Sequence, residues 1–122
     1  MGELPQGKII QFKDKEFNVS VADNGITLMR GLSGAESLEP YDGMLFDFGM
    51  NFRMNMWAKN LKFPLGVAFL SEEGVVMGLG RLDPEDESSF TLEAEEPGRY
   101  ALEAPIGFFV QNDIKIGDKF DL

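Results

Sequence analysis

Residues 44–56 read MLFDFGMNFRMNM, with a large apolar side chain at every even position. A period of two places those side chains on one face of a β-sheet. A strand through the whole stretch would be longer than most, so we expect a bend or turn near residues 49–53. We also expect Asp47 and Asn55 to be exposed, and the following residues to be buried: Met44, Phe46, Phe48, Met54 and Met56.

Alternating apolar runs continue on both sides of this stretch, and residues typical of turns separate them. The pattern predicts three hairpins, which turn near residues 13–15, 71–74 and 96–98. In the third hairpin the strands would be residues 90–94 and 100–104. Glu93, Glu95 and Glu103 alternate there with apolar side chains, so we expect these three carboxylates on the solvated face.

Two short helices and a last strand complete the expected elements. Residues 26–32 form the first helix, with Asp23 as its cap and with Ile26, Met29 and Leu32 on one apolar face. Residues 105–112 are expected to form a second helix, and residues 115–122 a closing strand. The expected fold is mainly β: a single antiparallel β-sandwich or jelly-roll-like domain over residues 1–122, with one or two short helices.

Composition excludes several kinds of chemistry. The chain has 122 residues and contains neither cysteine nor histidine, which excludes disulfides, thiol nucleophiles and a conventional zinc site. We therefore expect no metal and no cofactor, and interpret the methionines of residues 44–56 as core packing rather than as Cu(I) ligands. Asp and Glu outnumber Lys and Arg by 21 to 11, giving a formal charge of −10. Such a charge repels phosphate backbones, so we expect no nucleic-acid partner.

No stretch has the roughly 18 consecutive apolar residues that a membrane-spanning helix needs. The first residues also lack the basic and apolar regions of a signal peptide. As given, the chain is expected to be soluble, with no membrane span.

A compact group of polar and aromatic residues is the candidate site. Trp57, Lys59 and Asn60 lie together at the end of an expected strand, and Arg30 follows the first helix. Arg30 and Lys59 would donate charge-assisted hydrogen bonds, Trp57 would offer a stacking face, and Asn60 would orient a ligand. Two neighbouring cations need carboxylates or an anionic ligand between them. The local carboxylates that could neutralise them are Asp23, Asp42 and Asp47.

An ordered series of short motifs resembles a known family. The series comprises Val21-Ala22-Asp23, Arg30-Gly31-Leu32, Ser37-Leu38, Gly43–Phe48, Trp57-Ala58-Lys59-Asn60, Pro64–Phe69, Tyr100-Ala101-Leu102-Glu103 and Asn112–Asp118. Over about residues 19–120 it resembles the small, mostly prokaryotic proteins grouped as domain of unknown function 192. The resemblance implies two β-sheets with short helices, and it supplies no established reaction. Many such proteins carry an export leader or lipid anchor, which would place this one in the envelope if a leader was removed.

Two departures from the family pattern concern the candidate site. Ala58 stands where the family usually has Met, and Gly66 stands where an Asp commonly follows the Pro-Leu pair. If that Asp anchors a ligand, or a buried network with Lys59, this chain has lost or rerouted it.

The residues leave more than one class of function open. The leading interpretation is a non-enzymatic binding or accessory module for a small polar or anionic ligand, or for a protein partner. The alternative is a hydrolase or carbohydrate-active enzyme that uses paired carboxylates. An enzyme of that kind needs a cleft holding a carboxylate with a strongly raised pKa, whereas a binding module needs only the cleft.

Overall fold

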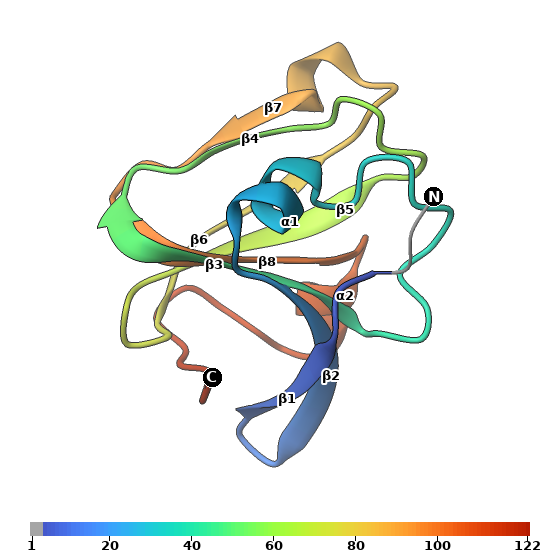
Figure 1. Ribbon diagram of the computed structural model, residues 1–122. Coiled ribbons are helices and arrows are strands. Elements are labelled where there is room, and N and C mark those ends of the chain that lie inside the picture. The colour runs from blue at the N-terminus through green and yellow to red at the C-terminus, as the bar shows by residue number, and fades with distance from the viewer. Residues whose placement is uncertain (1–3) are drawn as a thin grey trace.

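The computed structural model describes residues 4–122 and has a six-stranded sheet in the order β1-β2-β3-β8-β5-β6, with β4 and β7 as a separate pair (Figure 1). Its strands and two short α-helices confirm the expected mainly β fold. The elements are β1 (Gly7–Phe12), β2 (Lys15–Ala22), α1 (Gly25–Arg30), β3 (Gly43–Phe52), β4 (Asn55–Trp57), β5 (Leu65–Leu70), β6 (Val76–Leu82), a 3₁₀ turn (Glu87–Ser89), β7 (Thr91–Glu93), β8 (Gly98–Pro105) and α2 (Phe108–Gln111). Among residues 4–122, no helix is long and apolar enough to cross a membrane.

Two of the three expected hairpins form. β1 pairs with β2 around the turn at residues 13–14, and β5 pairs with β6 around residues 71–75. Gly74 closes the second turn with a φ of 86°, a conformation that favours glycine. A side chain at Gly74 would also collide with the backbone carbonyl of Phe120, so this turn requires glycine twice over.

The third expected hairpin is wrong. β7 pairs with β4 in the small sheet, while β8 lies between β3 and β5 in the large sheet and is antiparallel to both. The chain passes from one sheet to the other between Glu93 and Gly98, so the two strands do not meet. Both faces of β8 are also covered, because Ala101 belongs to the core cluster on one face and Leu102 and Ala104 belong to the cluster on the other.

The large sheet is mixed rather than wholly antiparallel. β2 and β3 are parallel neighbours, with Val19 opposite Gly43 and Ala22 opposite Phe46. Parallel neighbours need a crossover connection, and residues 23–42, which include α1, supply it. This connection carries the chain over one face of the sheet, where α1 lies in front of the strands in Figure 1.

α1 departs from its prediction at its cap and on its apolar face. Asn24, not Asp23, is the N-cap: its Oδ1 accepts a hydrogen bond of 3.0 Å from the Thr27 amide. Of the expected apolar face, Leu32 is buried, but Ile26 and Met29 are 81% and 86% exposed. Leu28 packs on the sheet instead.

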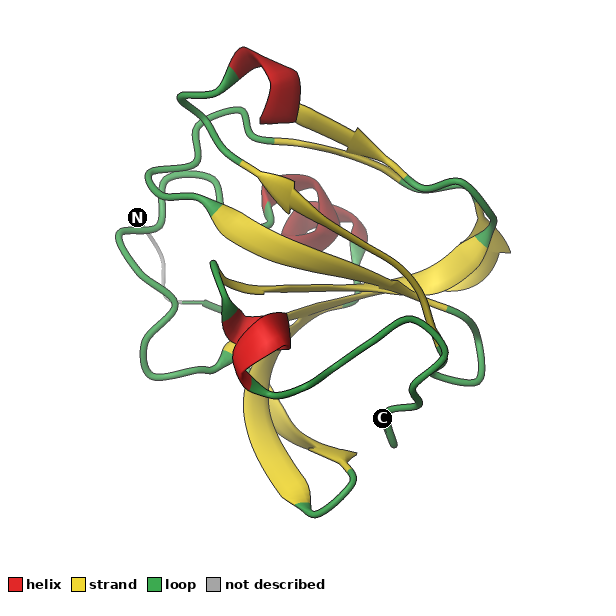
Figure 2. Ribbon diagram, turned by 180° about the vertical axis from the view of Figure 1, so that it is seen from behind, coloured by secondary structure: helices red, strands yellow, loops and turns green. Residues whose placement is uncertain are grey.

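The C-terminal region forms α2 within the expected range, but it forms no closing strand. Residues after 112 contact the sheet through two isolated bridges, Gln11 with Asp121 and Val75 with Lys119. The segment follows the side of the sheet that carries α2, which is turned toward the viewer in Figure 2.

β3 confirms most of the pattern in residues 44–56. Met44, Phe46 and Met54 are buried, Phe48 and Met56 are partly buried, and Asn55 is exposed. The strand continues to Phe52, with an irregular register after Asp47 where Gly49 takes a φ of 71°. Asp47 is half-buried rather than exposed, because it pairs with Arg99.

The two faces of the large sheet pack against different layers. The face that we call the sealed face carries Leu45, Ala68 and Leu102 beneath α2 and the C-terminal segment. The face that we call the pocket face carries Phe46, Val67 and Ala101 beneath the crossover and the small sheet. Figures 1 and 2 view the molecule from opposite sides, with α1 toward the viewer in Figure 1 and α2 toward the viewer in Figure 2.

Candidate functional site

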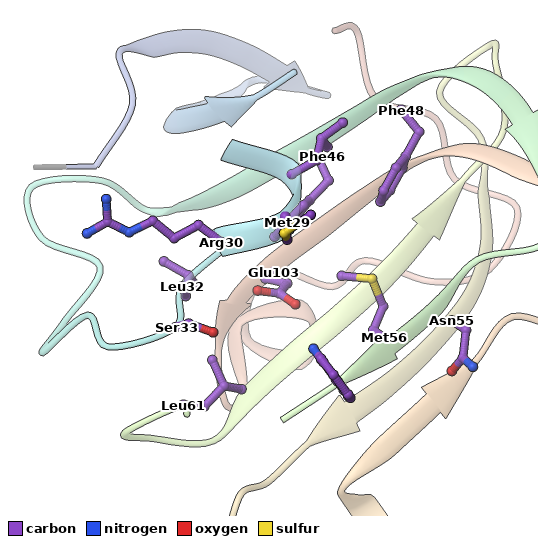
Figure 3. Close-up of a pocket in the computed structure, with 13 residues that line it drawn as sticks. Met29, Arg30, Leu32, Ser33, Phe46, Phe48, Asn55, Met56, Leu61 and Glu103 are labelled. Carbon is purple, nitrogen blue, oxygen red and sulfur yellow. The ribbon is translucent and has the colours of Figure 1, made fainter. Parts of the chain in front are cut away.

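A pocket of about 130 Å³ opens on the pocket face, between the crossover, β3 and β4. Glu103 of β8 lies at its floor. Figure 3 shows its carboxylate between Phe46 and Phe48 on one side and Met56 and Leu61 on the other. The remaining lining residues are Leu28, Met29, Arg30, Gly31, Leu32, Ser33, Asn55 and Trp57.

The Glu103 side chain is buried and has no partner among residues 4–122. Only 4% of the residue is exposed, and among residues 4–122 no side chain or amide makes a hydrogen bond or ion pair with its carboxylate. Burial raises its pKa from the ordinary 4.5 to about 8, with no charged neighbour contributing. A carboxyl group with this pKa is mostly protonated at pH 7. It can therefore both donate and accept a hydrogen bond.

Aromatic rings form the wall beside Glu103. The rings of Phe46 and Phe48 are nearly parallel, with centroids 6.1 Å apart. Gly31, at the end of α1, has a φ of 50°, and a Cβ there would lie 3.1 Å from the Phe46 ring. Glycine thus lets the crossover approach Phe46 closely enough to form the edge of the pocket.

The structure brings together three of the four residues singled out from the sequence. Arg30 and Trp57 both line the pocket. The Lys59 ammonium lies 5.1 Å from the centroid of the Trp57 ring, in a cation–π contact. Asn60 lies outside, at a neighbouring hollow that shares Ser33 and Leu61 with the pocket. The Arg30 side chain extends away from Glu103 (Figure 3).

Two hydrogen bonds fasten the loop after α1 to the loop after β4. Ser33 Oγ donates to the Lys59 carbonyl at 3.1 Å, and the Gly34 amide donates to the Asn60 carbonyl at 2.9 Å. Asn60 has a φ of 64°, a turn conformation that asparagine tolerates. The backbone of residues 59–60 therefore holds the rim of the pocket.

Two of the three carboxylates considered as partners of Arg30 and Lys59 bind other groups. Burial tends to raise the pKa of Asp47, but hydrogen bonds from Arg99 and the Gly49 amide outweigh it and lower that pKa. Asp42 accepts a hydrogen bond of 2.8 Å from the Asn18 amide, and Asp23 is not among the pocket residues. Asp42 and Asp47 therefore do not neutralise Arg30 and Lys59 as expected. Asp42 binds the backbone of β2, and Asp47 pairs with Arg99 of β8.

Gly66 lies on the sealed face, so a carboxylate at this position would not reach the pocket. It is opposite Ala104 in the sheet, and a Cβ at Gly66 would lie 3.2 Å from the Phe109 ring of α2. The side chains of Val67 and Glu103 project from the other face. An Asp at position 66 would therefore face α2 rather than the pocket.

Glu103 is the pocket residue that the alternation pattern misassigned. Its place after Leu102 in an alternating run indicated a solvated face, but β8 is a central strand and the crossover covers that face. The usable signal was the motif Tyr100-Ala101-Leu102-Glu103, which places a carboxylate among small and apolar residues.

Comparisons with known proteins identify the family. Among curated proteins, none matches this sequence. A protein from Sinorhizobium meliloti, provisionally described as a transcription regulator, has a similar crystal structure with a TM-score of 0.85 at 25% identity, covering 98% of this chain and 97% of that one. A protein of unknown function from Novosphingobium aromaticivorans has a TM-score of 0.83 at 22% identity, covering 97% of this chain and 86% of that one. The model of DUF192, "Uncharacterized ACR", matches residues 8–122, and the chain therefore belongs to this family of uncharacterised proteins.

Proposed function

We propose that this protein binds a small organic molecule in the pocket above Glu103. The observation that carries the proposal is a carboxyl group that is almost fully buried, has no partner among residues 4–122 and faces a cavity. Among residues 4–122 no fully buried side-chain oxygen lacks a hydrogen bond, so the Glu103 oxygens keep some accessible surface in the pocket. Burial of the rest of the carboxyl group still limits its hydration, which costs free energy. A ligand with a hydrogen-bonding group would remove that cost and leave its apolar part against the aromatic wall.

The size of the pocket limits the ligand. An apolar cavity of about 150 Å³ accommodates a benzene molecule. The pocket of about 130 Å³ therefore suits a molecule, or the end of a larger molecule, of about six non-hydrogen atoms. Trp57, which is 59% exposed at the mouth, would stack on the part of the ligand that reaches solvent.

Binding is favoured over the alternative of an enzyme with paired carboxylates. The raised pKa of Glu103 suits a general acid. A second Asp or Glu does not line the pocket within the described part of the chain, however, and the glycosidase mechanism needs two carboxylates facing one substrate. The net charge of −10 also opposes attraction to a nucleic-acid backbone.

Mapping of amide chemical shifts by NMR would test the proposal. The probes are 1-butanol, n-butylamine, butyrate and acetamide, each titrated into the full chain. We expect at least one to shift the amides of Phe46, Trp57 and Glu103 saturably, while the amides of Val110 and Gln111 on the opposite side stay unchanged. If none of the four probes moves the pocket amides saturably, the proposal is rejected.

A further inference from the structure

The charged side chains near the pocket do not pair with the Glu103 carboxylate. α1 contributes Arg30, whose side chain extends away from Glu103 in Figure 3. The segment after β4 contributes Lys59, whose ammonium lies over the Trp57 ring. β3 and β5 contribute apolar side chains to this face. Burial is the cause of the raised Glu103 pKa, and within residues 4–122 no cation offsets it. A positive group entering the pocket would therefore compensate this carboxylate.

The other walls also suit a cation with an apolar stem. Aromatic faces attract cations, most strongly where water is excluded, and the rings of Phe46, Phe48 and Trp57 all line the pocket. Met56 and Leu61 provide apolar surface for a short alkyl chain. The net charge of −10 raises the local concentration of cations around the molecule. An anion would instead meet a carboxyl group that must stay protonated.

Resting on the proposed function, we infer that the pocket recognises a primary alkylammonium group, which forms an ion pair with ionised Glu103. The ammonium N–H groups would donate to the two carboxylate oxygens, and the alkyl stem would lie against Met56 and the phenylalanine rings. The ligand occupies the pocket in its ammonium form, so the proton held by Glu103 leaves for solvent when the ion pair forms.

Proton release makes the affinity depend on pH in a defined direction. With a pKa of about 8, Glu103 must lose its proton before it can pair with the ammonium. Below pH 8 the observed association constant should rise about tenfold per pH unit. It should level off above that pH, until the amine itself deprotonates near pH 10. A neutral alcohol, which needs no ionised partner, should lack this rise.

Isothermal titration calorimetry with n-butylammonium, 1-butanol and butyrate at pH 6, 7 and 8 tests the inference. At pH 8 we expect n-butylammonium to bind roughly ten- to a hundredfold more tightly than 1-butanol, because hydrogen bonds between charged partners are stronger. At pH 7, titrations in phosphate and in Tris should report the release of close to one proton per ammonium bound. Equal or tighter binding of 1-butanol or butyrate would overturn the inference while leaving the proposed small-molecule pocket in place.

Two variants with the same change of charge complete the test. Glu103→Gln keeps the shape of the side chain and should lower n-butylammonium affinity at pH 8 by at least about tenfold. Glu95→Gln removes an exposed carboxylate and should leave the affinity within about twofold, because exposed charges are screened. If both variants lose affinity equally, general charge attraction explains the binding and the inference fails. Circular dichroism establishes that both variants are folded.

Discussion

Leu102 and Glu103 are neighbours on β8, yet they enter opposite faces of the sheet with opposite consequences. Leu102 is 1% exposed and packs under α2 and the C-terminal segment, among apolar side chains. Glu103 is 4% exposed and faces a cavity under the crossover. Similar burial thus conceals a difference in chemistry. Leu102 contacts apolar side chains that suit it, whereas the Glu103 carboxyl group has no polar partner in the described part of the chain.

The two faces of β8 therefore differ in what they contribute to the protein. The sealed face gains free energy from every apolar contact it makes. The pocket face keeps an uncompensated carboxyl group, which lowers the free energy of unfolding wherever its ionised form would otherwise be favoured. Sites that sacrifice stability in this way are typical of ligand binding or catalysis.

The largest effect is expected from moving the carboxylate to the sealed face. Leu102→Glu loses the leucine packing and buries a polar group among the apolar side chains of the sealed face. The free energy of unfolding should fall by about 5 kcal/mol or more. Urea denaturation followed by circular dichroism would measure the loss, and a loss below about 2 kcal/mol would mean that the sealed face is not closed.

A large loss of stability is also expected from a change in the wall of the pocket. Phe46→Ala removes a ring that is 3% exposed, so unfolding should become easier by about 3–5 kcal/mol. The same denaturation experiment applies. A near-neutral result would show that the pocket face contributes little to the core.

The third prediction concerns pH and compares Glu103→Gln with the parent. The Glu103 pKa is about 8 in the folded chain against an ordinary 4.5, so the folded state binds more protons between these values. The parent therefore loses stability relative to the variant as pH rises, by roughly 2 kcal/mol or slightly more between pH 5 and pH 7.

Thermal and urea unfolding at pH 5, 6 and 7 would measure this difference. The Glu95→Gln variant serves as the control and should follow the parent at all three pH values. If Glu103→Gln also follows the parent, the carboxyl group is not held in a weakly polar environment.

The smallest effect is expected on the outer side of α1. Ile26→Ser exchanges an 81% exposed side chain for a polar one of similar helix propensity. The free energy of unfolding should change by no more than about 0.5 kcal/mol. A larger loss in the isolated protein would indicate that α1 packs differently from the arrangement in Figure 1.

Local signals in the sequence predicted much of the sheet. The hairpins around Lys13 and Gly74 and the face that includes Met44 and Phe46 depend on neighbouring residues, so alternation and turn chemistry identify them. The pairing of β7 and β8 depends on segments far apart in sequence, and alternation carries no information about it. The parallel pairing of β2 with β3 was missed for the same reason.

The site was only partly accessible to the same reasoning. Trp57, Lys59 and Arg30 stood out as unusual residues at expected element ends, and the structure places them at or beside one pocket. Glu103 resembled an ordinary surface residue, because alternation tells which residues share a face but not whether another layer covers it. The family pattern connects position 66 with the site. The register opposite Ala104 instead places Gly66 on the sealed face, and the sequence alone does not reveal that register.

The crossover between β2 and β3 gives the pocket two parts with different freedom to change. The floor, Glu103 beside Phe46, is fixed by the register of central strands, where an insertion would move every side chain to the other face. The rim from Arg30 to Ser33 belongs to a connection between strands, and connections accept substitutions and changes of length. Ligand preference can therefore be redesigned, by evolution or in the laboratory, by exchanging residues 23–42 as one cassette while the carboxylate stays in place.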